Sequence, residues 1–286
     1  MKKVVLITLV YTIFLPFIFS TISQAKGKKI QINERNFPNV SIRMVFSEKI
    51  DKNKDGILQR KELDKVKKLK IDGDCKDIDI QGISYLSRLR ELEIKARSIS
   101  SIDDLRKLTK LKKLSLTMSV GGNLRLAYGP KNLEELTINC KYLDKVELWM
   151  IEKLKKLSFI KESNLRELEI TGSPKMKKLN LDNVIKLKVL TIDGVGLKKL
   201  NIQNLSELEK LTAFDCKLIK KIDLRKNEKL KYLFWNYSAL KNIKWGEKPN
   251  LQYIELIGNP LRKKVDLKKF SALIYVKVSR NKISSY

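Results

Sequence analysis

One apolar motif recurs along most of this chain and constrains its fold more than any other feature. The motif is Leu-x-x-Leu-x-Leu, in which other apolar residues replace some of the leucines. Its instances begin at Leu89, Leu111, Leu133, Leu154, Leu165, Leu187, Leu208, Leu230, Leu251 and Leu273. The starting positions of successive instances differ by 21 or 22, except for one step of 11. The alternation of apolar and polar residues within each motif predicts a strand with one buried face.

A repeat period of this length falls in the range of leucine-rich repeats, in which each repeat adds one strand to a solenoid. We therefore expect an α/β repeat solenoid, a leucine-rich repeat horseshoe, over residues 73–286. A weaker apolar pair lies about half a period after several motifs, as in Val146/Leu148, and we expect it to line the convex wall of the same core. The step of 11 between residues 154 and 165 indicates a half-repeat slip with irregular curvature.

Residues 51–62 have the spacing of a twelve-residue calcium loop. The predicted ligands are five side-chain oxygens and one backbone carbonyl, from Asp51, Asn53, Asp55, Ile57, Gln59 and Glu62. Gly56 stands at the sixth position, where the backbone must turn sharply. Because Ca²⁺ takes six to eight oxygen ligands, the loop predicts Ca²⁺ as the cofactor. The alternative is a degenerate loop that keeps its turn without binding a metal.

Helices are expected on both sides of this loop, over residues 38–50 and 59–69. Together with the loop they would form a small amino-terminal helical cap over residues 26–72, similar to an EF-hand. A solenoid must protect the open edge of its first repeat, and we expect the cap to do this. Calcium sensors usually pair two such loops, so the presence of a single loop favours a structural role for calcium.

Three segments give the chain a family resemblance by their order. Ile32–Asn39 ends in Phe37-Pro38-Asn39, the calcium loop follows, and Gly82-Ile83 precedes the first repeat. The chain resembles exported leucine-rich repeat proteins of low-GC Gram-positive bacteria, which carry a Phe-Pro-Asp segment, an EF-hand-like calcium loop and a Gly-Ile step. The resemblance implies an exported binding protein. Asn39 replaces the Asp that is usual in that family, and Gln59 stands where Ser is common.

Residues 1–25 have the composition of a secretory signal peptide. Lys2 and Lys3 precede an apolar run that extends to Phe19, and Ser23 and Ala25 are small residues suited to cleavage. The run is short for a membrane span of about 20 residues. We expect a secreted, extracellular protein with no membrane insertion after signal cleavage.

Charge suggests a second kind of partner. The sequence has 61 Lys and Arg against 32 Asp and Glu, a net charge of +29; removing Lys2 and Lys3 leaves 59 against 32, or +27. Such a surface favours anionic cell-wall polymers, acidic glycans or nucleic acid. The lysines are also interleaved with acidic residues along the chain, as on any solvated repeat surface. Electrostatic association with the cell wall is therefore the alternative function, and no nucleic acid partner is expected.

Enzymatic chemistry finds little support in the sequence. The chain has no His, which removes the commonest general base and the Ser-His and Cys-His pairs. Its three cysteines are Cys75, Cys140 and Cys216. In the predicted register, Cys140 and Cys216 are about 19 Å apart at about 4.8 Å per strand, whereas a disulfide needs α-carbons within about 7 Å. We expect unpaired cysteines and a protein that is not an enzyme.

An aromatic cluster is the best candidate for a binding site. Three successive motifs place Tyr232, Tyr253 and Tyr275 at the same outward position, and Phe234 lies beside them. Tyr is enriched at interfaces, so the cluster predicts that the concave face binds a protein or glycan ligand. Cross-strand stacking that stabilises the sheet is the alternative. Upstream, the same column is expected to continue as a mixed-charge surface through Lys113, Glu135, Lys156, Glu167 and Lys210.

Overall fold

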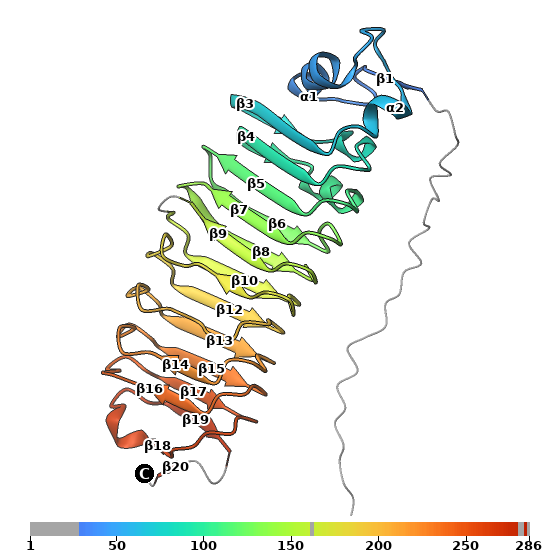
Figure 1. Ribbon diagram of the computed structural model, residues 1–286. Helices are drawn as coiled ribbons and strands as arrows, with labels where there is room; N and C mark the ends of the chain where they lie inside the picture. The colour runs from blue at the N-terminus through green and yellow to red at the C-terminus, as the bar shows by residue number, and fades with distance from the viewer. Residues whose placement is uncertain (1–28, 161–162, 280–282, 285–286) are drawn as a thin grey trace, which may run out of the picture.

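The computed structural model describes residues 29–160, 163–279 and 283–284, without the side chains of Asp74, Cys75, Ile283 and Ser284. The signal peptide expected over residues 1–25 lies outside the described residues. Within them, the chain winds into stacked coils that extend from an amino-terminal cap to the carboxy-terminal end (Figure 1).

The cap contains β1 (Ile30–Gln31), α1 (Val40–Val45), a π-helical turn (Phe46–Ile50), β2 (Ile57–Leu58) and α2 (Arg60–Leu63). The strands of the coils are β3 (Lys68–Asp79), β4 (Glu91–Ser100), β5 (Lys113–Met118), β6 (Gly122–Ala127), β7 (Glu135–Asn139), β8 (Leu143–Trp149), β9 (Lys156–Phe159), β10 (Glu167–Thr171), β11 (Lys178–Leu179), β12 (Val189–Asp193), β13 (Lys210–Phe214), β14 (Lys221–Asp223), β15 (Tyr232–Asn236), β16 (Asn242–Lys244), β17 (Tyr253–Leu256), β18 (Val265–Asp266), β19 (Tyr275–Val278) and β20 (Ile283–Ser284). Short 3₁₀ helices lie at Ile83–Tyr85, Ile102–Lys107 and Leu267–Lys269.

Two parallel sheets form the main walls of the coils. The six-stranded sheet has the order β11-β9-β7-β5-β4-β3, and the eight-stranded sheet has the order β19-β17-β15-β13-β12-β10-β8-β6. Two short pairs, β14-β16 and β18-β20, continue the first wall toward the carboxyl end. Parallel strands of successive coils with leucines facing a shared core make this chain a leucine-rich repeat solenoid, as the motif predicted.

The step of 11 between motifs has a simple structural origin. The motif at Leu154 ends in β9 of the six-stranded sheet, whereas the motif at Leu165 ends in β10 of the eight-stranded sheet. This step is half a coil, so the motif moves from one wall to the other while both sheets continue. Glu167 of β10 is in register with Lys145 of β8, which carries the weaker apolar pair of the preceding coil.

This arrangement corrects two expectations. The sequence predicts that Val146 and Leu148 line a convex wall apart from the motif strands. Their strand β8 instead pairs directly with β10, a strand of the later motifs, so the pair shares a wall with those motifs. The expected mixed-charge column is also divided. Lys113 and Glu135 are register partners in the six-stranded sheet, and Lys156 continues the same column. Glu167 and Lys210 belong to the eight-stranded sheet instead.

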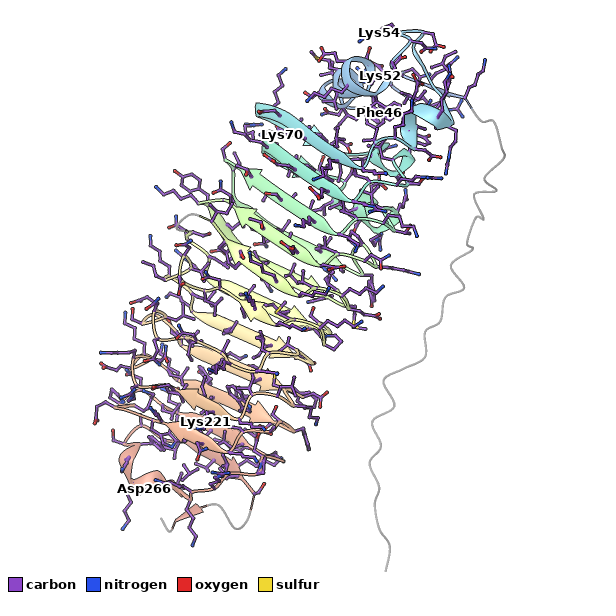
Figure 2. The ribbon with its side chains drawn as sticks, in the orientation of Figure 1. Phe46, Lys52, Lys54, Lys70, Lys221 and Asp266 are labelled. Carbon is purple, nitrogen blue, oxygen red and sulfur yellow. The ribbon has the colours of Figure 1, made fainter. Side chains whose placement is uncertain are left out.

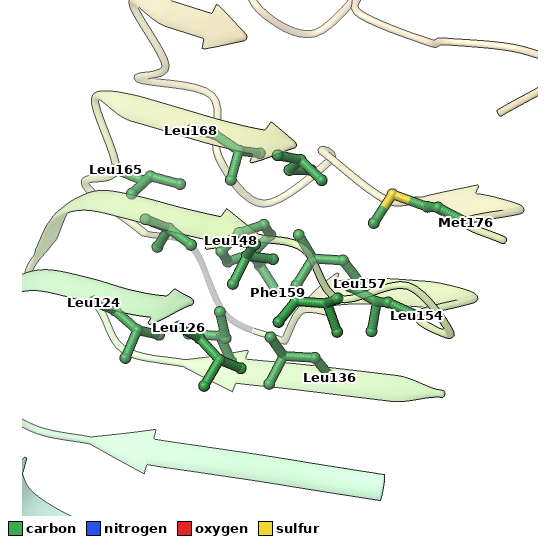
Figure 3. Packing of buried hydrophobic residues seen from close by; sticks show 14 of the residues in the cluster. Leu124, Leu126, Leu136, Leu148, Leu154, Leu157, Phe159, Leu165, Leu168 and Met176 are labelled. Carbon is green, nitrogen blue, oxygen red and sulfur yellow. The ribbon is translucent and has the colours of Figure 1, made fainter. Parts of the chain in front are cut away.

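One apolar core runs through the point where the motif changes walls. Leu154, Leu157 and Phe159 enter it from one wall, and Leu165 and Leu168 enter it from the other; all five are buried. Figure 3 shows these side chains packing between the two sets of strands, with Met176 nearby. The core is therefore continuous where the motif spacing is not.

The cap packs on the first coil through aromatic contacts. The rings of Phe37 and Phe46 lie 4.4 Å apart, and Phe37 also contacts Tyr85 with centroids at 5.5 Å. Gly82 has φ +90°, and a Cβ there would lie 2.5 Å from the carbonyl oxygen of Asn36, so only glycine fits this junction.

Helix α2 is shorter than the expected 59–69, and β3 already begins at Lys68.

Asn39 uses its amide in a way that an Asp at this position could not. Its Oδ1 caps α1 by accepting from the backbone amides of Ser41 and Ile42, at 3.0 and 3.2 Å. Its Nδ2 donates to the carbonyl of Asp77 in β3, at 3.0 Å. The amide of Asn39 therefore adds a hydrogen bond between the cap and the first coil.

Candidate functional site

The predicted aromatic residues come together on the outer face of the eight-stranded sheet. Tyr232, Tyr253 and Tyr275 are register partners on β15, β17 and β19. The rings of Tyr232 and Tyr253 stack at 5.1 Å and 19°, and those of Tyr253 and Tyr275 lie 6.1 Å apart. Phe234 lies parallel to Tyr232 at 6.5 Å. The column is partly open to solvent, with Tyr275 at 41% exposure.

Further aromatic residues extend this surface toward the strand ends, and the sequence analysis did not single them out. Phe214 and Tyr237 meet edge to face at 5.3 Å and are 43% and 50% exposed. Phe214 stands at an outward position in the alternation of β13, and this alternation could have identified it as an exposed aromatic residue from the sequence. Tyr237 sits after β15 with φ +48°, a conformation that strand alternation does not predict.

The sides of the aromatic surface carry charge. Lys210 precedes Tyr232 in the column, and its Nζ lies 5.8 Å from the Phe234 ring centroid. Asp193, the register partner of Phe214, has its pKa raised by burial and, to a smaller extent, by the nearby Asp215. At the other end of the sheet, Arg125 stacks over Trp149 at 4.1 Å. The eight-stranded face thus passes from charged to aromatic as it approaches the carboxyl end.

The six-stranded sheet has a different outer face. A hollow of about 520 Å³ lies over β3, β4, β5 and β7. Its charges alternate and pair across strands: Lys68 with Glu91 at 2.9 Å, Lys70 with Glu93 at 3.0 Å, and Lys113 with Glu135 at 3.5 Å. Exposed ion pairs of this kind contribute little stability, and they leave the hollow with balanced charge.

The predicted calcium loop is held by hydrogen bonds among its own groups. The Asp51 carboxylate accepts from the backbone amides of Lys54 and Gly56, both at 2.9 Å. Glu62 accepts from the amides of Lys52 and Gln59, at 2.8 and 2.9 Å. Position seven of the loop pairs with β1, in which Gln31 is opposite Ile57. The strand β1 therefore supports the loop at this position.

The remaining predicted ligands lie on the solvent side of the loop. Asp55 accepts from the Asn53 amide at 2.8 Å and from the Gln59 amide at 3.3 Å. A backbone hydrogen bond from Ile57 lowers the pKa of Asp55. Among the described residues, no three His, Cys, Asp or Glu side chains gather as a metal cluster.

The donor set nevertheless suits a hard cation. Asp51 and Glu62 are only 1% and 5% exposed. Within the described parts of the chain, neither carboxylate has a Lys or Arg partner. Buried carboxylates require charge compensation. Backbone amides supply only part of that compensation, and a calcium ion would supply the rest.

Comparison with known proteins identifies no family. No family model and no curated protein matches the chain. Among solved structures, it is similar to an internalin, inlF, from Listeria monocytogenes, at 18% identity over 90% of this chain and 94% of that one, with a TM-score of 0.32. It is also similar to internalin C2 from the same organism, at 18% identity over 88% and 98% of the two chains, with a TM-score of 0.36.

A third similar structure is the functional domain of InlJ from Listeria monocytogenes, at 18% identity, with 92% of this chain and 64% of that chain covered and a TM-score of 0.37. At such identities and TM-scores the fold assignment rests on the strand pairing of this chain itself. In the part of the chain that the structure describes, no helix is long and apolar enough to cross a membrane.

Proposed function

We propose that this chain is an exported, calcium-stabilised binding protein that holds a protein or glycan ligand on its eight-stranded sheet. The observation that carries this proposal is the aromatic patch, defined here as Tyr232, Phe234, Tyr253 and Tyr275. Its rings are stacked on successive rigid strands, so little side-chain entropy remains to be lost on binding. A leucine-rich repeat solenoid presents such a sheet as an extended surface, which is suited to binding.

Calcium is proposed as a structural cofactor of the cap. The ligands would be Asp51, Asn53, Asp55, Gln59 and Glu62 with the carbonyl of Ile57, and the ion would compensate the two buried carboxylates. An affinity of about 10⁻⁴–10⁻³ M is sufficient for extracellular modules. Export is supported by the composition of residues 1–25.

The aromatic patch is tested by changing Tyr232, Tyr253 and Tyr275 together to Ser. Ligands captured from extracellular protein and glycan pools by the parent protein should be lost or bound at least tenfold more weakly by the triple variant. The control changes Tyr128 and Tyr142 to Ser, because these exposed tyrosines lie outside the patch, at 65% and 56% exposure. It should retain the ligand.

Thermal unfolding separates the proposal from the purely structural alternative. If the column serves only the sheet, the triple variant loses stability, at roughly 0.2–1 kcal/mol for each cross-strand pair, and a folded sample still binds the captured ligand like the parent. That result would remove the patch as a binding site.

A further inference from the structure

We propose that the solenoid has a second binding site, a basic hollow that holds a polymer bearing phosphate groups. The hollow has a volume of about 400 Å³ and lies over β14, β16 and the turn before β18. Six cationic side chains line it: Lys221, Lys241, Lys244, Arg262, Lys263 and Lys264. None of the described residues in its lining is acidic. Figure 2 labels Lys221 near the carboxyl end of the solenoid.

The coil geometry gathers these cations from three successive turns. Lys221 of β14 is in register with Asn242 of β16, which places Lys241 and Lys244 beside it. The next coil follows directly, since the backbone amide of Arg262 donates to the carbonyl of Lys241 at 2.9 Å. Residues about one repeat apart in the chain therefore lie about 4.8 Å apart in the stack. This is why charge that is dispersed in the sequence becomes concentrated on the surface.

Most of this charge has no internal partner. Lys244 Nζ lies 3.9 Å from Asp223, but that carboxylate is already bound by the Arg225 guanidinium at 2.8 Å. For the other five cations, no carboxylate of the described chain lies within ion-pair distance. The hollow over the six-stranded sheet is different, because there each of three lysines pairs with a Glu. An external anion is thus the natural partner of the basic hollow and not of the other.

The type of cation indicates what kind of anion fits. Five of the six side chains are lysines, which act as hydrated point charges, and only Arg262 offers a planar fork for bidentate contacts. The hollow therefore attracts charge without selecting a planar group. A chain with several phosphates in a row would place one anion near each cation.

The aromatic residue in the lining of the hollow argues against bases as ligands. Trp245 is partly buried, and its ring packs on Phe270 at 5.0 Å and 57°. Sites for single-stranded nucleic acids usually provide exposed aromatic rings on which successive bases stack. The described lining of the hollow lacks such a platform, so the phosphates are expected on a non-aromatic backbone, either a polyol phosphate or inorganic polyphosphate.

The hollow is independent of the aromatic patch. Its strand β14 lies half a coil from β15, so the two surfaces belong to opposite walls with the core between them. Changing Tyr232, Tyr253 and Tyr275 to Ser is therefore expected to leave polymer binding unchanged, whatever it does to the ligand on the sheet.

The experiment measures binding of poly(glycerol phosphate) and inorganic polyphosphate to the mature protein at 50 and 200 mM salt. If the five cations without an internal partner each neutralise one phosphate, the plot of log K against log salt concentration should have a slope of about −3.5, the value for a single-stranded polyanion. The fourfold rise in salt should then weaken binding about 100-fold. The variant R262Q/K263Q/K264Q should bind at least tenfold more weakly at low salt, with a slope about 2 units shallower.

A matched control removes the same charge elsewhere. Lys110, Lys131 and Lys156 are exposed, and within the described chain they have no ion pair; changing them to Gln should leave the affinity within about twofold. A second variant, K221Q/K244Q, tests the hollow from neighbouring strands and should also weaken binding. Circular dichroism melts confirm that each variant is folded.

The polymer that binds more tightly identifies the source of the phosphates. Equal losses in R262Q/K263Q/K264Q and in the control variant would show that the charge acts diffusely, and would overturn the site. Tighter binding of oligo-dT than of poly(glycerol phosphate) with the same number of phosphates would overturn the proposed chemistry in favour of nucleic acid. Absence of binding to either phosphate polymer at 50 mM salt would also overturn it.

Discussion

Buried polar side chains satisfy the backbone where one coil passes into the next. Asn259 donates to the carbonyl of Trp235 at 2.5 Å and accepts from the amide of Leu240 at 3.2 Å. Ser238 accepts from the amide of Cys216 at 2.9 Å. The sequence places a small or polar residue at the third position after several motifs, where a turning chain would otherwise leave backbone groups without partners. It did not predict Asn183 and Asn227, which serve coils from other positions, as their amides donate to carbonyls of the preceding coil.

The thiols give a prediction at this scale. Cys140 and Cys216 are free, as expected, and lie in turns after β7 and β13, on different walls. Burial raises the pKa of Cys216 to about 12. Because the thiolate is the reactive form, Cys216 should resist alkylation in the native protein at pH 8. Mass spectrometry of the denatured, unreduced protein should find all three cysteines alkylated, and one reactive thiol per chain would contradict this.

A second residue-scale prediction concerns the calcium loop. Calcium at 100 times its Kd should stabilise the parent protein by about 2.7 kcal/mol. D51A/E62A should lose this effect, because it removes both buried carboxylates. The control D72A/E152A changes two exposed carboxylates and should respond to calcium like the parent. Identical melting temperatures of the parent in calcium and in chelator would refute the calcium proposal.

At the scale of elements, the sequence predicted the strands well but not the wall to which each belongs. Leu-x-x-Leu-x-Leu reports an inward-facing strand, and every such motif forms one. The motif carries no information about which side of the coil it occupies. The weaker pairs held that information: Leu124 and the weaker-pair residue Val146 keep the coil spacing of the later motif residues Leu168 and Leu190, and all four are register partners in one continuous sheet. The expected second cap helix was wrong at its carboxyl end: α2 ends at Leu63, and Lys68 and Leu69 pair with β4 as part of a strand.

In two neighbouring motifs of the eight-stranded sheet, a small and a large residue replace the last leucine, and their sizes compensate for each other. Ala213 and Trp235 are register partners, and both are buried, at 1% and 0% exposure. A213L should overpack this site and cost about 1–3 kcal/mol, and W235L should leave a cavity. The double variant should be more stable than the sum of the two single effects predicts, by about 0.5–3 kcal/mol in urea unfolding. Additive effects would show that the two side chains do not compensate, and A127L on the outer face is the control.

At the scale of the whole molecule, the change of walls does not divide the core. Buried residues of both walls pack together on each side of residues 154–165 (Figure 3). Neighbouring coils in a solenoid are coupled through their shared interface, so a break in motif spacing need not be a break in cooperativity. The eight-stranded sheet passes through this region without interruption, from β6 to β19.

Urea unfolding of the mature protein should therefore show one transition. Far-UV circular dichroism reports on all coils, whereas tryptophan fluorescence reports on Trp149, Trp235 and Trp245, which all lie in the second half of the chain. The two midpoints should coincide. A fluorescence midpoint that is clearly separated from the dichroism midpoint would show that the halves unfold independently.

The two walls of the solenoid both carry β-sheets, so the coils have two sheet faces instead of one. Here the outer faces of the two sheets lie on opposite walls, and they differ in chemistry: one carries the aromatic patch and the other carries the hollow of balanced charge. A body docked on one does not obstruct a body docked on the other. The solenoid therefore presents two surfaces of different chemistry in opposite directions from one shared core.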